Sequence, residues 1–274
     1  MRLSIHHRTE YRYDEPVQFA LQRLRLTPVT GPGQTVVEWT VQVDGATVEV
    51  SYADQFLNQV HLVSVAGGRD SIIVTAVGEI ETEDRAGVFG PHTAHTPLWL
   101  FLRETPLTKP GKLVREIARS STGESDLARM HALMELINTT VSYTPGATDS
   151  LTTAEQALEA KAGVCQDHAH IFIAAARTLS LPARYISGYL LMDEVEQQTA
   201  THAWAEVFLT GLGWVGFDAA NKICPDARYV RIATGLDYTD AAPISGLVNG
   251  AVNETLDVTL TVQEGGQSQS QSQG

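Results

Sequence analysis

The sequence predicts an α+β protein. An N-terminal antiparallel, β-sandwich-like domain precedes a core that contains both helices and strands. Three observations support this fold class. Residues 2–85 alternate apolar and polar side chains between turn residues, as strands do. Helical spacing of apolar residues begins near residue 96, and alternating strands return after Pro182.

The N-terminal strands are separated by glycine-containing turns. Residues 2–13 (RLSIHHRTEYRY) form the first alternating segment. VVEWTVQV and ATVEVSY flank Asp44-Gly45, a typical hairpin turn. QVHLVSV and SIIVTAVGEIET flank residues 67–70, Gly-Gly-Arg-Asp, which we expect to form another turn. This regular spacing of short strands and turns predicts the sandwich-like domain.

Four helical segments are predicted in the middle of the chain. A short one follows Pro110 and a longer one follows Ser125, each with apolar side chains three and four residues apart. Thr153 and Gln156 have the spacing of a capping box before ALEAK, and we expect Gly163 to end that helix.

The fourth helix includes the end of the stretch AGVCQDHAH, residues 162–170. Its apolar positions recur every three or four residues: Cys165, Ala169, Phe172, Ala176 and Leu179. We therefore expect a helix that runs to about Ser180 and ends before Pro182. Cys165 lies in its first turn, on the face that packs inward.

The last third of the chain predicts strands at ARYISGYLL, THAWAEVFL and GWVGFDAA, the latter two joined by a hairpin at residues 210–213. ETLDVTLTV is a final alternating strand. We expect an N-terminal β domain at 1–95, a catalytic core with the C-terminal strand at 96–263, and a disordered, Gln- and Ser-rich tail at 264–274.

Composition excludes several classes of function. The 274 residues carry a net charge of −13, which gives no basic surface for nucleic acid or for an anionic membrane. No apolar run is long enough to span a bilayer, and the N-terminus lacks the apolar centre of an export signal. Two cysteines make no disulfide framework, so the expected compartment is the cytoplasm, where cysteines are more often free, catalytic or metal-bound.

Cys165 can be read as a packing residue or as a nucleophile. A lone cysteine on an apolar helix face is usually buried packing. The N-terminus of a helix, however, favours the thiolate through its partial positive charge, and its free N–H groups can hold an oxyanion. His202 in THAWAEV and Asp218 in GWVGFDAAN would add a base and an orienting carboxylate.

The hairpin at residues 210–213 predicts that His202 and Asp218 are neighbours. A tight loop there places the two residues either directly opposite or diagonally on one face of the paired strands. A metal site made of Cys165, His168 and His170 is the weaker alternative, because His170 points away from the other two on a helix and no CxxC or HExxH spacing occurs.

At AGVCQDHAH, THAWAEVFL and GWVGFDAAN the sequence resembles the transglutaminase-like superfamily of papain-type thiol enzymes. It is most similar to the bacterial branch, in which a β domain precedes the core, and RLSIHHRTEYRYDEPV and RLRLTP resemble that β domain. The likeness spans roughly residues 2–250. It implies the papain/transglutaminase-like core fold, with the cysteine helix packed on the sheet that carries the histidine and the aspartate.

The resemblance also implies roles for three residues: Cys165 as the nucleophile, His202 as the general base and acid, and Asp218 as the residue that orients His202. The sequence departs from the family pattern at two places. His168 stands where the family often has Phe, and Ala219-Ala220 stand where it often has Pro-Thr. The first touches the cleft wall, while the second leaves the three residues intact.

We therefore expect a thiol-dependent amidohydrolase or peptidase that cleaves peptide or isopeptide-type amides through a Cys-His-Asp triad and a thioester. A transglutaminase and a non-catalytic peptide-binding protein on the same fold are the alternatives. Trp204, Tyr189 and His168 are the candidate substrate-binding residues. We expect no cofactor and no metal, a peptide or amide as partner, and neither nucleic acid nor membrane; the oligomeric state stays open.

Overall fold

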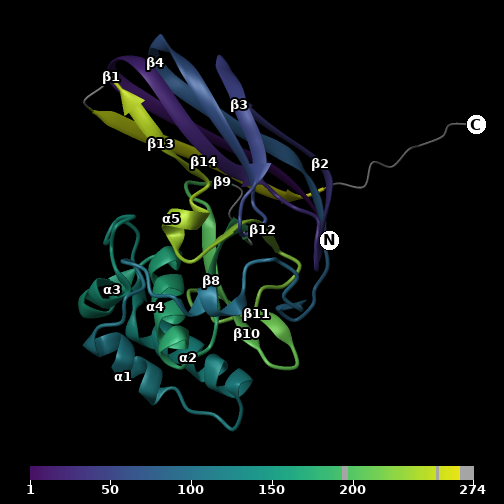
Figure 1. Cartoon of the computed structure of the whole chain (residues 1–274), viewed down its shortest axis with the longest axis vertical. Coiled ribbons are helices and arrows are strands. Elements are labelled where there is room, and N and C mark those ends of the chain that lie inside the picture. The colour runs from purple at the N-terminus through teal and green to yellow at the C-terminus, as the bar shows by residue number, and fades with distance from the viewer. Residues whose placement is uncertain (193–196, 251–252, 266–274) are drawn as a thin grey trace, which may run out of the picture.

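The structure is a computed structural model that describes residues 1–192, 197–250 and 253–265. A large sheet of seven strands occupies one end of the molecule, and helices occupy the other (Figure 1). The sheet contains β1 (Arg2–Thr27), β2 (Gln34–Val43), β3 (Ala46–Ala53), β4 (Gln59–Thr82), β9 (Gln197–Gln198), β13 (Ile244–Asn249) and β14 (Glu254–Glu264). All its pairings are antiparallel, as predicted.

Two long strands, β1 and β4, run through the whole sheet and pair with each other. The expected turn at residues 67–70 is therefore wrong, because β4 continues through it as one strand. The β1–β4 register shifts between Arg12 and Phe19, and Gly67 lies so close to the backbone of Gln18 that a Cβ there would clash. The glycines thus permit a close strand approach at an irregularity and do not end the strand.

Residues from both ends of these strands form one buried core, consistent with the sandwich-like packing expected. It includes Leu3, Ile5, Leu24, Val63 and Ile72. The last two strands also belong to this sheet, since β13 and β14 both pair with β1. The C-terminal strand, which the sequence placed with the core, is therefore part of the N-terminal sheet. Residues 266–274 of the expected tail lie outside the described residues.

The second sheet has five strands in the order β12-β8-β10-β11-β5. They are β5 (Val88–Gly90), β8 (Ala183–Leu190), β10 (His202–Leu209), β11 (Gly213–Phe217) and β12 (Tyr229–Gly235). Around it lie the short helix η1 (Leu98–Leu102), α1 (Lys112–Ser120), α2 (Asp126–Thr140), α3 (Ala154–Ala160), α4 (Cys165–Thr178) and α5 (Tyr238–Ala241). The α+β class is confirmed.

Helix α4 is the centre of this half. It packs on β8 and β10, and α1, α2 and α3 pack around it. Twelve of its side chains are buried, four of them polar or charged, so the helix is surrounded by protein on nearly all sides. The rings of Phe172 on α4 and Phe217 on β11 stack at 5.2 Å between centroids. The predicted packing of the cysteine helix on an antiparallel sheet is confirmed.

The approach to α4 differs from the prediction in one detail. Thr153 and Gln156 form the expected capping box of α3. The helix ends at Lys161, whose φ of 52° is left-handed, and not at Gly163. Gly163 instead lies in the short strand β7 (Ala162–Gly163), which pairs in parallel with β6 (Ser142–Tyr143). A Cβ on Gly163 would lie 2.7 Å from Asp167, so glycine is needed there for close packing.

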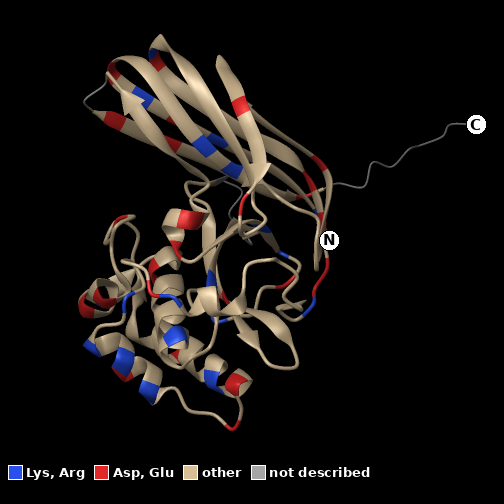
Figure 2. Ribbon diagram, in the orientation of Figure 1, with Lys and Arg blue, Asp and Glu red and all other residues tan. Residues whose placement is uncertain are grey.

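Charged residues of both signs are scattered over both halves of the molecule (Figure 2). Within the described ranges, no helix is long and apolar enough to cross a membrane.

Candidate active site

Cys165 is the first residue of α4, and its side chain is 8% exposed. The preceding residue, Val164, is extended, and its backbone N–H donates to Asp167 Oδ2 at 2.7 Å. Thr148 Oγ1 donates to the same oxygen at 2.7 Å. Asp167 thus fixes the point at which the helix begins, and with it the position of the thiol.

His202 and Asp218 come together at the ends of two paired strands. Ala205 lies opposite Phe217 in the β10–β11 ladder, which places His202 and Asp218 diagonally on one face, as predicted. His202 Nε2 lies 2.6 Å from Asp218 Oδ2, and both side chains are buried. Burial raises the pKa of Asp218, but His202, Tyr229 and Asn221 outweigh that effect and hold it below its usual range.

The imidazole of His202 connects Asp218 to Cys165. Burial lowers the pKa of His202, but the carboxylate of Asp218 and the hydrogen bond with the Cys165 thiol outweigh it and raise this pKa to about 10. Nε2 is already bound to Asp218, so Nδ1 is the nitrogen left for the thiol. The three residues named from the sequence are therefore brought together in one buried cluster.

Two residues that the sequence analysis did not assign to the site hold Asp218 in place. Tyr229 Oη and Asn221 Nδ2 each donate to Asp218 Oδ2 at 2.7 Å. The backbone N–H groups of Ala220 and Asn221 donate to Asp218 Oδ1. With four donors besides His202, the carboxylate is satisfied as an ion in a buried position.

The segment after Asp218 is also anchored to the helical half. Asn138 Nδ2, on α2, donates to the carbonyl oxygens of Ala219 and Ala220, in both cases at 2.9 Å. These are the positions at which the chain departs from Pro-Thr. The departure leaves a loop that is held by hydrogen bonds to its backbone, so it does not disturb the geometry around Asp218.

Tyr143 lies beside the thiol and was missed by sequence analysis. The parallel pairing of β6 with β7 places Tyr143 opposite Gly163, two residues before Cys165. The phenol is half-exposed, and both the thiol and the backbone N–H of Cys165 act on its pKa. Burial and the neighbouring thiol raise the pKa of Tyr143 to about 12. No local sequence signal marks this contact, because it depends on a two-residue parallel bridge.

Two of the residues expected to bind substrate, Tyr189 and His168, lie in the protein interior. Tyr189 is fully buried under the large sheet, where its hydroxyl bonds to His7 Nδ1 at 2.9 Å. The ring nitrogens of His168 bond to the carbonyl oxygens of Val164 and Val141. Neither side chain exposes surface to a substrate. The expectation that Tyr189 and His168 bind substrate is therefore wrong for this structure, in which both pack in the interior.

Trp204 is likewise buried, and it supports the site from behind. Its ring stacks on His202 at 6.3 Å between centroids and meets Tyr229 edge-on at 5.3 Å. It therefore limits the rotation of His202 and does not line a cleft in this structure.

The alternative of a metal ion on the cysteine helix finds no geometric support. Among the described residues, no group of three or more His, Cys, Asp or Glu side chains is arranged to hold an ion. His168 is occupied by two carbonyls, and His170 Nε2 accepts the backbone N–H of Tyr238. The arrangement around Cys165 can instead supply a nucleophile, a proton carrier and an orienting carboxylate.

Each half of the chain matches a known protein family. Residues 111–219 match the family described as the transglutaminase-like superfamily, and residues 3–81 match the bacterial transglutaminase-like N-terminal region. Uncharacterized proteins of Mycobacterium leprae and Mycobacterium tuberculosis H37Rv are each 28% identical to the chain. The matches cover 95% of this chain in both cases, and 98% and 92% of those proteins.

A solved structure has the same fold over nearly the whole chain. It is a candidate cysteine protease from Cytophaga hutchinsonii, with a TM-score of 0.73 at 22% identity. The match covers 96% of this chain and 98% of that one. The long sheet, the central helix and the second sheet are therefore a shared architecture.

Proposed function

The chain belongs to the transglutaminase-like superfamily, and on that premise we propose that it is a thiol-dependent amidohydrolase acting on peptide or isopeptide-type amide bonds. Cys165 is the proposed nucleophile, His202 the general base and acid, and Asp218 the orienting carboxylate. The chemistry needs no cofactor. Both cysteines are free, which accords with a reducing compartment such as the cytoplasm.

One observation carries this proposal. His202 is held between Asp218, at 2.6 Å, and the thiol at the start of α4, and its pKa is raised to about 10. A histidine that remains protonated at neutral pH beside a thiol favours the thiolate–imidazolium pair, which is the reactive form of a cysteine nucleophile. A cysteine that served only as packing would have no need of this arrangement.

The proposed reaction has two halves. The Cys165 sulfur attacks the amide carbonyl carbon, and the tetrahedral intermediate collapses when His202 gives its proton to the departing amine nitrogen. The product of this half is a thioester on Cys165. His202, now neutral, then removes a proton from water, the hydroxide attacks the thioester, and the acid and the thiolate are released with the proton on His202.

The backbone N–H of Cys165 is the donor that we assign to the developing oxyanion. Tyr143 is half-exposed and lies beside Cys165. Its phenol therefore borders the path by which a substrate carbonyl would reach this donor.

Trapping of the acyl-enzyme tests the proposal. The protein is incubated with a library of peptide and glutamine-bearing amides, quenched in acid and examined by mass spectrometry for an acyl mass on the peptide that contains Cys165. We expect the adduct in the wild type and in Cys224→Ala, and none in Cys165→Ala. The absence of any adduct, together with unreactive Cys165, would point to the non-catalytic peptide-binding alternative.

The same experiment distinguishes hydrolysis from acyl transfer. Adding a primary amine such as methylamine to the reaction lets it compete with water for the thioester. We expect free acid to remain the main product at millimolar amine. Amide as the dominant product would overturn the hydrolase assignment in favour of a transglutaminase.

A further inference from the structure

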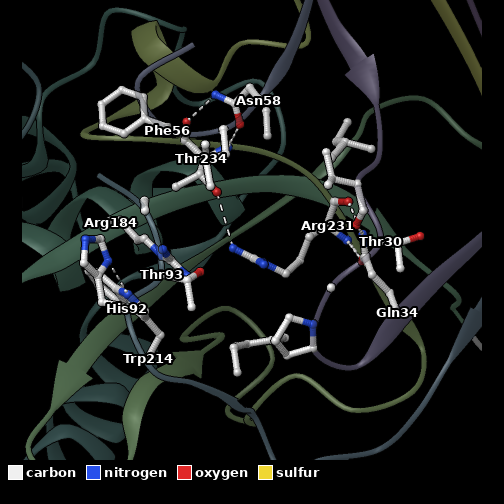
Figure 3. Close-up of a pocket in the computed structure, with 18 of the residues that line it drawn as sticks. Thr30, Gln34, Phe56, Asn58, His92, Thr93, Arg184, Trp214, Arg231 and Thr234 are labelled. Carbon is white, nitrogen blue, oxygen red and sulfur yellow. Dashed lines mark hydrogen bonds between the residues drawn. The ribbon is translucent and has the colours of Figure 1, made fainter. Parts of the chain in front are cut away.

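A cavity of about 180 Å³ lies between the two halves of the molecule, away from the cysteine (Figure 3). The N-terminal half contributes residues 29–34 and 56–58, and the segment leading to the helices contributes residues 89–94. The floor comes from the second sheet: Arg184 on β8, Trp214 on β11 and residues 231–234 on β12. The cavity thus forms only when both halves are assembled.

Two arginines of this cavity share a single carboxylate. Arg184 Nε lies 2.7 Å from Glu206 Oε2, and Arg231 Nε lies 2.8 Å from Glu206 Oε1. The Glu206 side chain is fully buried, whereas those of Arg184 and Arg231 are 12% and 21% exposed. Two guanidinium groups and one carboxylate leave one positive charge that this cluster does not balance.

The guanidinium groups keep donors free toward the cavity. The hydrogen bonds and ion pairs found for both arginines within the described residues use Nε and Nη2, so Nη1 of each is without a partner there. Figure 3 shows the guanidinium group of Arg231 extending into the cavity toward Arg184. Burial and the charge of Arg231 lower the pKa of Arg184 while Glu206 raises it, and the net result is a pKa of about 10.

The other walls are aromatic or already satisfied. Trp214 covers the Arg184 guanidinium at 3.9 Å, and Phe89 lies 4.9 Å from that of Arg231. His92 contributes no charge-assisted donor, because Nδ1 accepts from Trp214 Nε1 and Nε2 faces the Thr96 carbonyl. The cavity therefore combines one cationic end with aromatic walls and polar groups that are mostly satisfied within the protein, a make-up that suits a small amphipathic ligand.

We propose that this cavity binds a small organic acid, with its carboxylate between Arg184 and Arg231 and its apolar body against the aromatic walls. A monoanion balances the single excess charge. The planar fork of a guanidinium matches a carboxylate in two-point contact. The volume is several times the share of one water in the liquid, about 30 Å³, so it has room for a body as well as a head group.

Calorimetric titration of the full chain with benzoate tests this site, and benzamide is the neutral isostere. We expect benzoate to bind with one-to-one stoichiometry and benzamide to bind at least tenfold more weakly. Equal binding of the two compounds would overturn the role of the charge. Binding of inorganic phosphate without binding of benzoate would overturn the apolar body and indicate a site for a bare oxyanion.

Variants assign the binding to the cavity. Arg231→Gln leaves Arg184 and Glu206 as a balanced pair, and we expect at least a tenfold loss of benzoate affinity. Arg12→Gln is the matched control, since Arg12 pairs with Glu10 on the large sheet away from the cavity. Unchanged affinity in Arg231→Gln, or an equal loss in both variants, contradicts the proposal.

A measurement on the wild type keeps the test valid if Arg231→Gln does not fold. Phenylglyoxal modifies accessible guanidinium groups, and the modified peptides can be identified by mass spectrometry. We expect benzoate to slow the labelling of Arg231 and Arg184 at least threefold and to leave Arg12 unaffected. Equal labelling with and without benzoate overturns the site.

Discussion

The two cysteines occupy different chemical environments, although the sequence offers no disulfide partner for either. Cys165 begins a helix and lies beside His202, whose pKa is raised to about 10. Cys224 is half-buried beside Gly87, and burial raises its pKa to about 11. Reactivity at neutral pH is therefore expected to concentrate on one of the two thiols.

The first prediction concerns these thiols. Cys165→Ala should lower turnover of a substrate found by acyl-enzyme trapping by more than about a thousandfold, because the covalent route is lost. Its free energy of unfolding should fall by only about 1 kcal/mol, the cost of a small cavity. Cys224→Ala, the control, should retain activity. Steady-state rates and urea unfolding measure both effects, and full activity in Cys165→Ala would exclude the nucleophile.

The second prediction concerns the charge on His202. Asp218 is the main group that raises the pKa of His202, so Asp218→Asn should let burial lower it again. Iodoacetamide labelling of Cys165 at pH 6 should then slow at least tenfold, because less thiolate–imidazolium pair is present. Asp226→Asn removes a carboxylate that pairs with Arg228, and it should label like the wild type. Identical pH profiles in all three proteins would mean that the ion pair does not exist.

The placement of His202 and Asp218 could be predicted because a two-stranded hairpin has only two faces. The even register puts both on one face. Tyr143, Asn221 and Tyr229 could not be found in this way. The contact of Tyr143 with Cys165 depends on the pairing of β6 with β7, and that of Tyr229 with Asp218 on the return of β12, neither of which local patterns specify. Asn221 contacts Asp218 within the local turn after β11, where an asparagine is also a common turn residue and so gave no distinct signal.

At the scale of single elements, the start of α4 determines where the Cys165 thiol lies. The helix has no serine or threonine at its N-cap, which is Val164. Asp167, in the first turn, performs the capping by accepting the Val164 backbone N–H. Burial raises the pKa of Asp167, and the hydrogen bonds that it accepts oppose the rise. The hydrogen bonds that fix the start of α4 therefore depend on a single carboxylate, that of Asp167.

Asp167→Ala should therefore destabilise the protein by about 1–3 kcal/mol, because a buried N–H and a hydroxyl lose their acceptor. Asp167→Asn keeps an oxygen acceptor and should cost less. The exposed Asp126, in the first turn of α2, is the control: Asp126→Ala should cost well below 1 kcal/mol, about the worth of a helix-dipole contact. Urea unfolding with the three variants measures the order. A cost for Asp167→Ala no larger than that for Asp126→Ala would show that the carboxylate is dispensable.

The helices and strands could be predicted from the sequence better than the pairing of the strands could. The spacing of apolar residues correctly indicated α1, α2, α4 and the strands β8, β10 and β11, since each is long enough to show its period. The Gly-Gly segment in β4 was misread because glycine marks both turns and close strand approaches, and only the neighbouring strand distinguishes them. The same limit applies to β14, whose partner is β1, more than two hundred residues away in sequence.

At the scale of the whole molecule, a buried histidine joins the two halves. His7, on β1, bonds to Tyr189 on β8 at 2.9 Å and to Thr9 at 3.1 Å. Burial, with a smaller contribution from the nearby His6, lowers the pKa of His7 to about 4. His170, buried beside Tyr185 and Asp237, has its pKa lowered to about 4 mainly by burial as well. Both must remain neutral in the folded protein.

This arrangement predicts acid sensitivity. The folded-state pKa of His7 lies below its unfolded value of 6.5, so the unfolded chain binds the proton more readily between pH 6.5 and 4. Stability should fall as the pH drops through that window, by roughly 2 kcal/mol for this residue between pH 7 and 5. His7→Gln should flatten the dependence, and His95→Gln, at an exposed position, should not. Urea unfolding at both pH values provides the comparison, and parallel losses in all three proteins would contradict the assignment.

The pairing of β1 with β13 and β14 also governs how the protein is made. The ribosome releases β1 more than two hundred residues before its two partners. At about 5–20 residues per second, roughly 10–50 s separate these events. During that time one long edge of a nascent sheet has no partner and is open to aggregation. We expect chains stalled before residue 244 to be cut by protease within β1, and chains released beyond residue 264 to resist. The time taken to translate the helical half is therefore the time for which this strand edge of the nascent chain stays unpaired and needs the protection of chaperones.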